Sequence, residues 1–151
     1  MVWQATAPET SPVSSDHRGT GPLNGARILV IEDEFLIATV AEDVLRDAGA
    51  GEIVVALTLQ QAHDALAQPL PFDAAVIDIQ LAEGSDTGLA LAEIALKRLI
   101  PILFLTGYES DLALPEPFST ARLLTKPCAP RALVEAVSHA ISTAGKADPL
   151  P

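Results

Sequence analysis

The sequence is poor in cysteine, in basic residues and in aromatic residues, and each shortage excludes a class of protein. Its one cysteine, Cys128, excludes an internal disulfide and a metal site built from several thiolates, and it is typical of a reducing compartment. Nine Lys and Arg against 20 Asp and Glu give a formal charge of −11, which argues against nucleic acid and anionic membranes as partners. With aromatics at 4% and hydrophobic residues at 49%, any core must be aliphatic.

Long apolar runs are also lacking. No segment approaches the ~20 consecutive apolar residues of a membrane-spanning helix, and the N-terminus lacks the basic-then-apolar order of a secretory signal. We therefore expect a cytoplasmic protein with one domain over residues 25–144. A proline- and serine-containing tail over residues 1–24 has no hydrophobic period and is expected to be disordered, with Trp3 as its one large apolar side chain. Residues 145–151 are expected to fray.

Short apolar runs alternate with segments of helical periodicity between these tails. The runs are rich in Ile, Val and Leu, which favours strands, and they lie at Arg27–Ile31, Ile53–Ala56, Ala74–Ile77, Ile102–Leu105 and Ala121–Thr125. Helices are predicted over Phe35–Ala48, Thr58–Ala67, Leu89–Arg98 and Pro130–Ile141. Continuously apolar strands alternating with helices indicate a doubly wound α/β domain, in which a five-stranded parallel sheet is covered on both faces.

Two of the helical segments carry more specific information. In residues 35–48, Leu36, Val40 and Val44 recur at helical spacing, which predicts an apolar stripe facing the core. Between the fourth and fifth strands, residues 108–119 contain two prolines, and a proline inside a helix costs ~3 kcal/mol. A fourth helix should therefore be short or absent.

Polar residues directly follow four of the five predicted strands. These residues are Glu32 and Asp33, Asp78, Thr106, and Lys126. Because the carboxyl ends of parallel strands meet at one edge of a sheet, three carboxylates, a hydroxyl and an ammonium are expected to converge there.

This combination of groups suits one chemical task. Clustered carboxylates repel one another unless a hard divalent cation lies between them, and Mg²⁺ prefers such oxygen ligands together with phosphate oxygens and water. Lys126 supplies a point charge suited to phosphate, and Thr106 supplies a hydroxyl donor. The set predicts attack by a carboxylate on phosphorus, with cations stabilising the charge on the phosphoryl oxygens.

The acidic pair, the Asp, the Thr and the Lys-Pro, in this order and at these strand ends, resemble the receiver domain of bacterial response regulators (CheY-like). The resemblance covers about Ala26 to Ile141. It implies a flavodoxin-like fold with strand order 2-1-3-4-5 and a bound Mg²⁺. It also implies a signalling domain rather than an enzyme, whose only chemistry is its own Mg²⁺-dependent phosphorylation and dephosphorylation.

The resemblance also implies a role for each site residue. Asp78 would be the phospho-acceptor and a metal ligand. Asp33 would bind Mg²⁺ directly, Glu32 mainly through water, and Gln80 through its backbone carbonyl. Thr106 and Lys126 would contact the phosphoryl group, with a cis peptide bond between Lys126 and Pro127 directing the ammonium inward.

One branch of the family is indicated by residues Phe104–Tyr108. They read Phe-Leu-Thr-Gly-Tyr, which resembles the Phe-Ala-Thr-Gly-Tyr signature of the "FAT GUY" branch, whose members are often single-domain proteins and in some cases serve general stress signalling. The aromatic switch residue usual in receivers is replaced by Leu123 or Leu124. Tyr108 either takes its place as the moving ring or packs on its own loop.

The resemblance therefore implies a stand-alone, monomeric or weakly dimeric response regulator. A histidine kinase or phosphotransfer protein would phosphorylate Asp78, and a separate, unidentified downstream protein would bind the product. No output domain is expected, since only about ten residues follow Ile141. The alternatives are a phosphate sink and a pseudo-receiver that binds its partners constitutively.

A more distant alternative is a phosphohydrolase of the haloacid dehalogenase type, which shares an Asp nucleophile, Thr, Lys and Mg²⁺. In that class the nucleophile follows the first strand and a second Asp stands two residues later. Here Glu32 and Asp33 follow the first strand, and Gln80 stands two residues after Asp78. The order of residues therefore disfavours this alternative.

Overall fold

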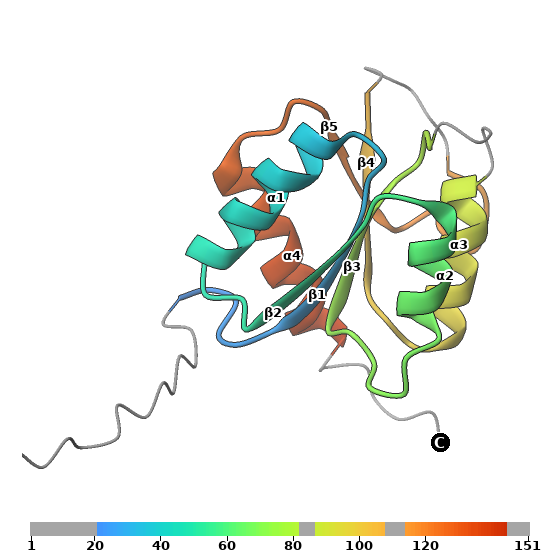
Figure 1. The fold of residues 1–151 in the computed structure, drawn as a ribbon, viewed down its shortest axis with the longest axis horizontal. Coiled ribbons are helices and arrows are strands. Elements are labelled where there is room, and N and C mark those ends of the chain that lie inside the picture. The colour runs from blue at the N-terminus through green and yellow to red at the C-terminus, as the bar shows by residue number, and fades with distance from the viewer. Residues whose placement is uncertain (1–20, 82–86, 108–113, 145–151) are drawn as a thin grey trace, which may run out of the picture.

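The computed structural model describes residues 21–81, 87–107 and 114–144, and every structural statement here refers to them (Figure 1). Five parallel strands form one sheet in the order β2-β1-β3-β4-β5. The strands are β1 (Arg27–Ile31), β2 (Glu52–Ala56), β3 (Ala74–Asp78), β4 (Ile102–Thr106) and β5 (Arg122–Thr125). The predicted doubly wound, flavodoxin-like sheet and its strand order are confirmed.

Four helices cover the two faces of the sheet. They are α1 (Phe35–Asp47), α2 (Leu59–Leu66), α3 (Thr87–Lys97) and α4 (Pro130–Ala144). Helices α1 and α4 pack on one face, and α2 and α3 pack on the other (Figure 1). The apolar side chains accordingly form two clusters separated by the sheet. Strand β3 lies between them and is buried along its whole length, which fixes the position of its last residue, Asp78. None of the described helices is long and apolar enough to cross a membrane.

The buried face of α1 differs from the one that the sequence predicted. Its buried residues are Ala38, Ala41 and Leu45. The predicted stripe is largely turned to solvent, since Leu36 is 77% exposed and Val40 is 60% exposed. The packed face therefore combines two alanines with Leu45, and a second apolar face of the helix is left outside.

The connection between β4 and β5 contains no helix over residues 114–121, which form turns. Phe118 from this stretch is buried and packs edge-on against Phe104, with ring centroids 5.5 Å apart. The expectation of a short or absent fourth helix therefore holds over the part of the connection that the structure describes. Tyr108 lies outside it.

The described chain begins with a turn that packs against the end of α1. Leu23, which the sequence placed in the N-terminal tail, is buried, and its N–H donates to the carbonyl of Ala48 at 3.1 Å. Gly25 N–H donates in the same way to Gly49 at 2.8 Å. The described chain therefore starts beside the C-terminal end of α1.

Helices α1 and α3 end in the same hydrogen-bonded motif but use different residues for it. After α1, Gly49 adopts a φ of 101° and the N–H of Ala50 donates to Leu45, which is a Schellman motif closed by glycine. After α3, Leu99 holds the equivalent place with a φ of 60°, and the N–H of Ile100 donates to Ala95. A left-handed conformation costs a non-glycine residue about 1–2 kcal/mol.

Leu99→Gly is expected to raise the free energy of unfolding by about 0.5–1 kcal/mol, because relief of the left-handed strain exceeds the entropy that glycine adds to the unfolded chain. Little packing is lost, since Leu99 is 87% exposed. Urea unfolding of both proteins measures the change. Leu96→Gly, inside α3, is the control and should lower stability by about 1 kcal/mol. Destabilisation by both substitutions to the same extent would contradict the explanation.

Candidate active site

The predicted polar residues meet at the carboxyl edge of the sheet. Asp78 ends the central strand β3, Glu32 follows the adjacent β1, Thr106 ends β4, and Lys126 follows β5. Glu32, Asp78 and Thr106 are almost completely buried. Ionisable groups are rarely buried to this degree unless they are paired or bind a ligand.

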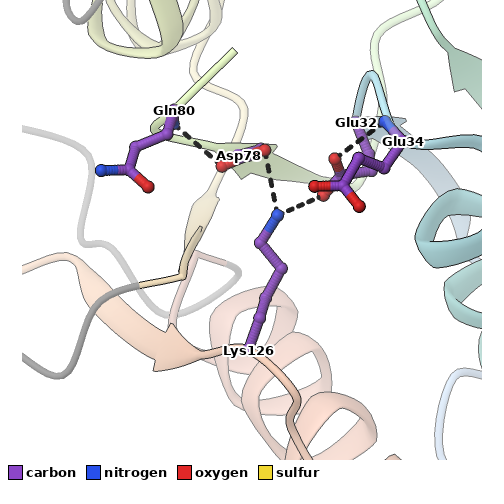
Figure 2. A network of polar contacts seen from close by, with 5 residues as sticks. All are labelled: Glu32, Glu34, Asp78, Gln80 and Lys126. Atoms are coloured by element: carbon purple, nitrogen blue, oxygen red, sulfur yellow. Dashed lines mark hydrogen bonds and ion pairs between the residues drawn. The ribbon is translucent and has the colours of Figure 1, made fainter. Parts of the chain in front are cut away.

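Lys126 bridges two of the carboxylates, as Figure 2 shows. Its Nζ lies 2.8 Å from Glu32 Oε2 and 3.0 Å from Asp78 Oδ2. The backbone N–H of Lys126 donates to the carbonyl of Thr106 at 2.7 Å, which ties the end of β5 to the end of β4. The Lys126–Pro127 peptide bond is cis, as expected. One ammonium thus connects residues that are 94 and 48 positions away in the chain.

The second oxygen of each of these carboxylates is held by the backbone. Gln80 N–H donates to Asp78 Oδ1 at 2.9 Å, and Glu34 N–H donates to Glu32 Oε1 at 3.1 Å. The Gln80 side chain points away from the Asp78 carboxylate (Figure 2). Both buried carboxylates are therefore oriented before any ligand binds.

Burial and pairing act in opposite directions on the charges of the site. Burial raises the pKa of Glu32 to about 7, and the hydrogen bonds from Lys126 and from Glu34 N–H offset only part of that effect. Burial lowers the pKa of Lys126, but its hydrogen bonds to Glu32 and Asp78 outweigh burial and raise the pKa above its ordinary value. Lys126 therefore stays charged, whereas Glu32 is held near the midpoint of its titration at neutral pH.

The three carboxylates suit a hard divalent cation. Glu32, Asp33 and Asp78 each offer one oxygen, and these oxygens all lie within 4.8 Å of one another. When all three are ionised, Lys126 compensates one of the charges and two remain. An all-oxygen site with two uncompensated negative charges has the chemistry of a Mg²⁺ site.

Glu32 gives the stability of the metal-free domain a pH dependence. Because the folded state binds the Glu32 proton more tightly than the unfolded chain, the neutral carboxyl stabilises the fold fully below the unfolded pKa, near 4.5, and this contribution is lost as pH rises to about 7. The unfolding free energy of the wild type, relative to Glu32→Gln, should therefore fall between about pH 5 and about pH 8.

Urea unfolding in the presence of a chelator measures this difference. Added Mg²⁺ should diminish the fall, because a cation stabilises the ionised carboxylates. A difference between the two proteins that stays constant with pH would show that Glu32 does not titrate in this range.

Gly88 is a part of the site that the sequence did not identify. It is the second residue of α3 and is buried. A Cβ placed on it would lie 2.4 Å from the carbonyl oxygen of Asp78 and 2.8 Å from the Cα of Ile79. The absence of a side chain thus lets the first turn of α3 contact the backbone of the candidate acceptor. A glycine at the start of a periodic segment was the only sequence signal for this contact.

The predicted switch region is described only in part. Tyr108 lies outside the described residues. Leu123 and Leu124, one of which replaces the usual aromatic residue, are both half-buried and pack on opposite faces of the sheet.

Comparisons with known proteins agree with this arrangement. A model of the family described as response regulator receiver domain matches residues 28–138. The phyllosphere-induced regulator PhyR of Methylorubrum extorquens is 34% identical over 115 residues, which are 76% of this chain and 43% of that protein. The chain thus spans less than half the length of this curated relative.

Solved structures show the same similarity. The solution structure of the PhyR response regulator REC domain of Erythrobacter litoralis is 32% identical, with a TM-score of 0.64, over 87% of this chain and 98% of that one. The crystal structure of a response regulator receiver protein from Sinorhizobium medicae is 25% identical, with a TM-score of 0.68, over 81% of this chain and 98% of that one.

Proposed function

Because this chain belongs to the response regulator receiver domain family, we propose that Asp78 accepts a phosphoryl group from a histidine kinase or a phosphotransfer protein. The observation that carries this proposal is the environment of Asp78. It is a buried carboxylate at the end of the central strand, with Lys126 on one oxygen and a backbone N–H on the other. A carboxylate held in this way is an oriented nucleophile beside a fixed positive charge.

The chemical step is a transfer between two covalent phosphoryl linkages. An oxygen of the ionised Asp78 carboxylate attacks phosphorus of the donor phosphohistidine, an O–P bond forms as the N–P bond breaks, and the leaving imidazole takes up a proton. Glu32, Asp33, Asp78 and the Gln80 carbonyl would hold Mg²⁺, which when bound offsets charge on the phosphoryl oxygens.

Lys126 and Thr106 are the residues proposed to detect the product. Phosphorylation replaces the single negative charge of the Asp78 carboxylate with a charge of about −2 on the phosphoryl oxygens. The Lys126 ammonium, which bridges Asp78 and Glu32 in this structure, would then pair with a phosphoryl oxygen, and the Thr106 hydroxyl would donate to another. Movement of these two residues would change the adjoining surface around β5, and Tyr108 would take part if it is the moving ring.

The signal would then pass to a separate protein that binds the phosphorylated surface. We place the chain in the branch with the Phe-Ala-Thr-Gly-Tyr signature on the basis of residues Phe104–Tyr108. We propose further that it acts in the cytoplasm as a monomer or weak dimer. Likeness to PhyR is consistent with a regulatory role.

Phosphotransfer profiling tests the proposal. The purified chain is mixed with phosphorylated histidine kinases and phosphotransfer proteins of its host in the presence of Mg²⁺, and Asp78→Ala is the control. Rapid label transfer from one donor to the wild type alone is the expected result. If no donor transfers label to the wild type, and the chain still binds its partners without phosphorylation, a pseudo-receiver would be favoured.

A further inference from the structure

A small cavity lies beside the candidate active site, between the ends of β1 and β2 and the starts of α2 and α3. Its volume is about 300 Å³, at the lower end of the range of about 300–1,000 Å³ typical of sites for small molecules. Helices α2 and α3 lie side by side there, on one face of the sheet (Figure 1). The aliphatic part of the lining includes Ile31, Ala56, Leu59 and Leu81. The cavity therefore has room for a small ligand.

Asp33 connects this cavity to the candidate acceptor. The Asp33 side chain lines the cavity, and one of its oxygens lies within 4.8 Å of an oxygen of Asp78. Two other lining residues are also close to the acceptor along the chain or in space. Leu81 stands three residues after Asp78, and Thr87 directly precedes Gly88, which packs against the Asp78 backbone. A ligand in the cavity would therefore lie next to a phosphoryl group that Asp78 attacks.

The lining favours a ligand with a short aliphatic tail and a polar end. None of the described lining residues is aromatic or basic. Two hydroxyl groups lie among the aliphatic side chains, those of Thr58 and Thr87. The Thr58 hydroxyl accepts a hydrogen bond from Gln61 N–H, a bond that leaves its own proton to be donated. Hydroxyl donors beside aliphatic side chains suit an acyl group, whose oxygens accept hydrogen bonds and whose tail is apolar.

We propose that the cavity holds the acyl group of a short-chain acyl phosphate, which would serve as a small-molecule phosphoryl donor. This inference rests on the proposed function of Asp78 as the acceptor. An oxygen of the ionised Asp78 carboxylate forms a bond to phosphorus while the bond between phosphorus and the acyl oxygen breaks. The acyl group leaves as a carboxylate, so the step needs no proton transfer. The hydroxyls of Thr58 and Thr87 would donate to the departing carboxylate.

The aliphatic lining predicts a preference for the length of the acyl tail. Burial of each additional methylene group strengthens binding about fourfold. Butyryl phosphate has two more methylene groups than acetyl phosphate, so the second-order rate constant for phosphorylation of Asp78 should be about tenfold higher with the butyryl donor. A much longer tail, as in dodecanoyl phosphate, should lose this advantage, because a cavity of about 300 Å³ cannot enclose it.

Intact mass spectrometry of the full chain, incubated with Mg²⁺ and either acetyl or butyryl phosphate, measures the two rate constants and their ratio. Leu59→Phe enlarges a half-buried lining residue and should reduce the ratio from about ten to about two, because the longer tail loses its space. Gln60→Phe places the same side chain on the exposed neighbouring residue, outside the lining, and should keep the ratio at about ten. Circular dichroism verifies that both variants are folded.

A binding measurement separates this inference from the proposed function. Acetyl and butyryl phosphonates cannot transfer their phosphorus, because a carbon–phosphorus bond replaces the bond that would break. The butyryl analogue should bind about tenfold more tightly and shift the methyl NMR signals of Leu59 and Leu81.

The outcomes of the two measurements differ for the two proposals. Chain-length-dependent binding in the cavity without phosphorylation of Asp78 by any donor would refute the proposed function and retain the acyl site. Equal rate constants with both acyl phosphates would overturn the inference while leaving Asp78 as the acceptor. A tenfold preference that survives in folded Leu59→Phe would likewise overturn it, because the tail would then lie outside the cavity.

Discussion

Asp78→Asn is expected to abolish phosphoryl uptake from a small acyl phosphate, down to the level of the uncatalysed background. The amide that replaces the carboxylate is a poor nucleophile. Among the described residues, Glu32 is the other buried carboxylate at a strand end that contacts Lys126. Its pKa is raised to about 7, which makes it a weaker candidate for the acceptor. Intact mass spectrometry after incubation with acetyl phosphate and Mg²⁺ measures the uptake.

The fold should survive this substitution. Asn keeps the shape of the side chain and an oxygen for Lys126, and removal of one charge reduces the repulsion with Glu32, so the free energy of unfolding should not fall. Glu34→Gln is the matched control, because Glu34 is an exposed acid that is absent from the carboxylate cluster. Equal uptake by the wild type and Asp78→Asn would assign the acceptor to another residue.

Gly88→Ala is expected to destabilise the domain by about 3 kcal/mol, at the upper end of the usual cost of overpacking. The new methyl group would lie 2.4 Å from the Asp78 carbonyl oxygen and 2.9 Å from that of Ile79. These are backbone atoms of a buried strand and its extension, so they cannot rotate away as a side chain could. Helix α3 must therefore move off the sheet, or the end of β3 must shift.

Urea unfolding measures the loss, and Gly107→Ala is the control within the same edge of the sheet. The nearest atom to a Cβ on Gly107 is the side-chain oxygen of Gln80, at 3.7 Å, which is an ordinary contact. This control should change stability by no more than about 0.5 kcal/mol. Because a shift of β3 would displace Asp78, Gly88→Ala should also slow phosphoryl uptake. Similar stability of the two variants would show that the packing of α3 on β3 tolerates a side chain.

The sequence by itself determined the sheet and the residues at its carboxyl edge. Continuously apolar runs such as Ala74–Ile77 can only be buried on both faces, which predicts parallel strands. Asp78 could be identified because it stands immediately after such a run, and Lys126 because it follows the last predicted strand at the same edge of the sheet. Thr58 likewise predicted the start of α2, and its hydroxyl accepts from Gln61 N–H at 3.1 Å.

Only the tertiary structure decided which surfaces meet. Helical spacing on α1 was satisfied both by Leu36 and Val40 and by Ala38 and Ala41, and hydrophobicity favoured the wrong face. Ala38 and Ala41 are buried together with Leu45 because the rotation of α1 on the sheet depends on the packing of the whole layer. Gly88 shows the same dependence, since its requirement arises from the backbone of a distant strand.

The bridge that Lys126 forms between Glu32 and Asp78 also depends on the tertiary structure. The sequence placed an ammonium and three carboxylates at one edge, but their spacing along the chain carries no information on distance. The burial of Glu32 raises its pKa and the contact with Lys126 lowers it, and these effects involve residues at the ends of three strands, β1, β3 and β5. Local sequence therefore fixes which groups reach the edge, whereas long-range packing fixes their separations and their charges.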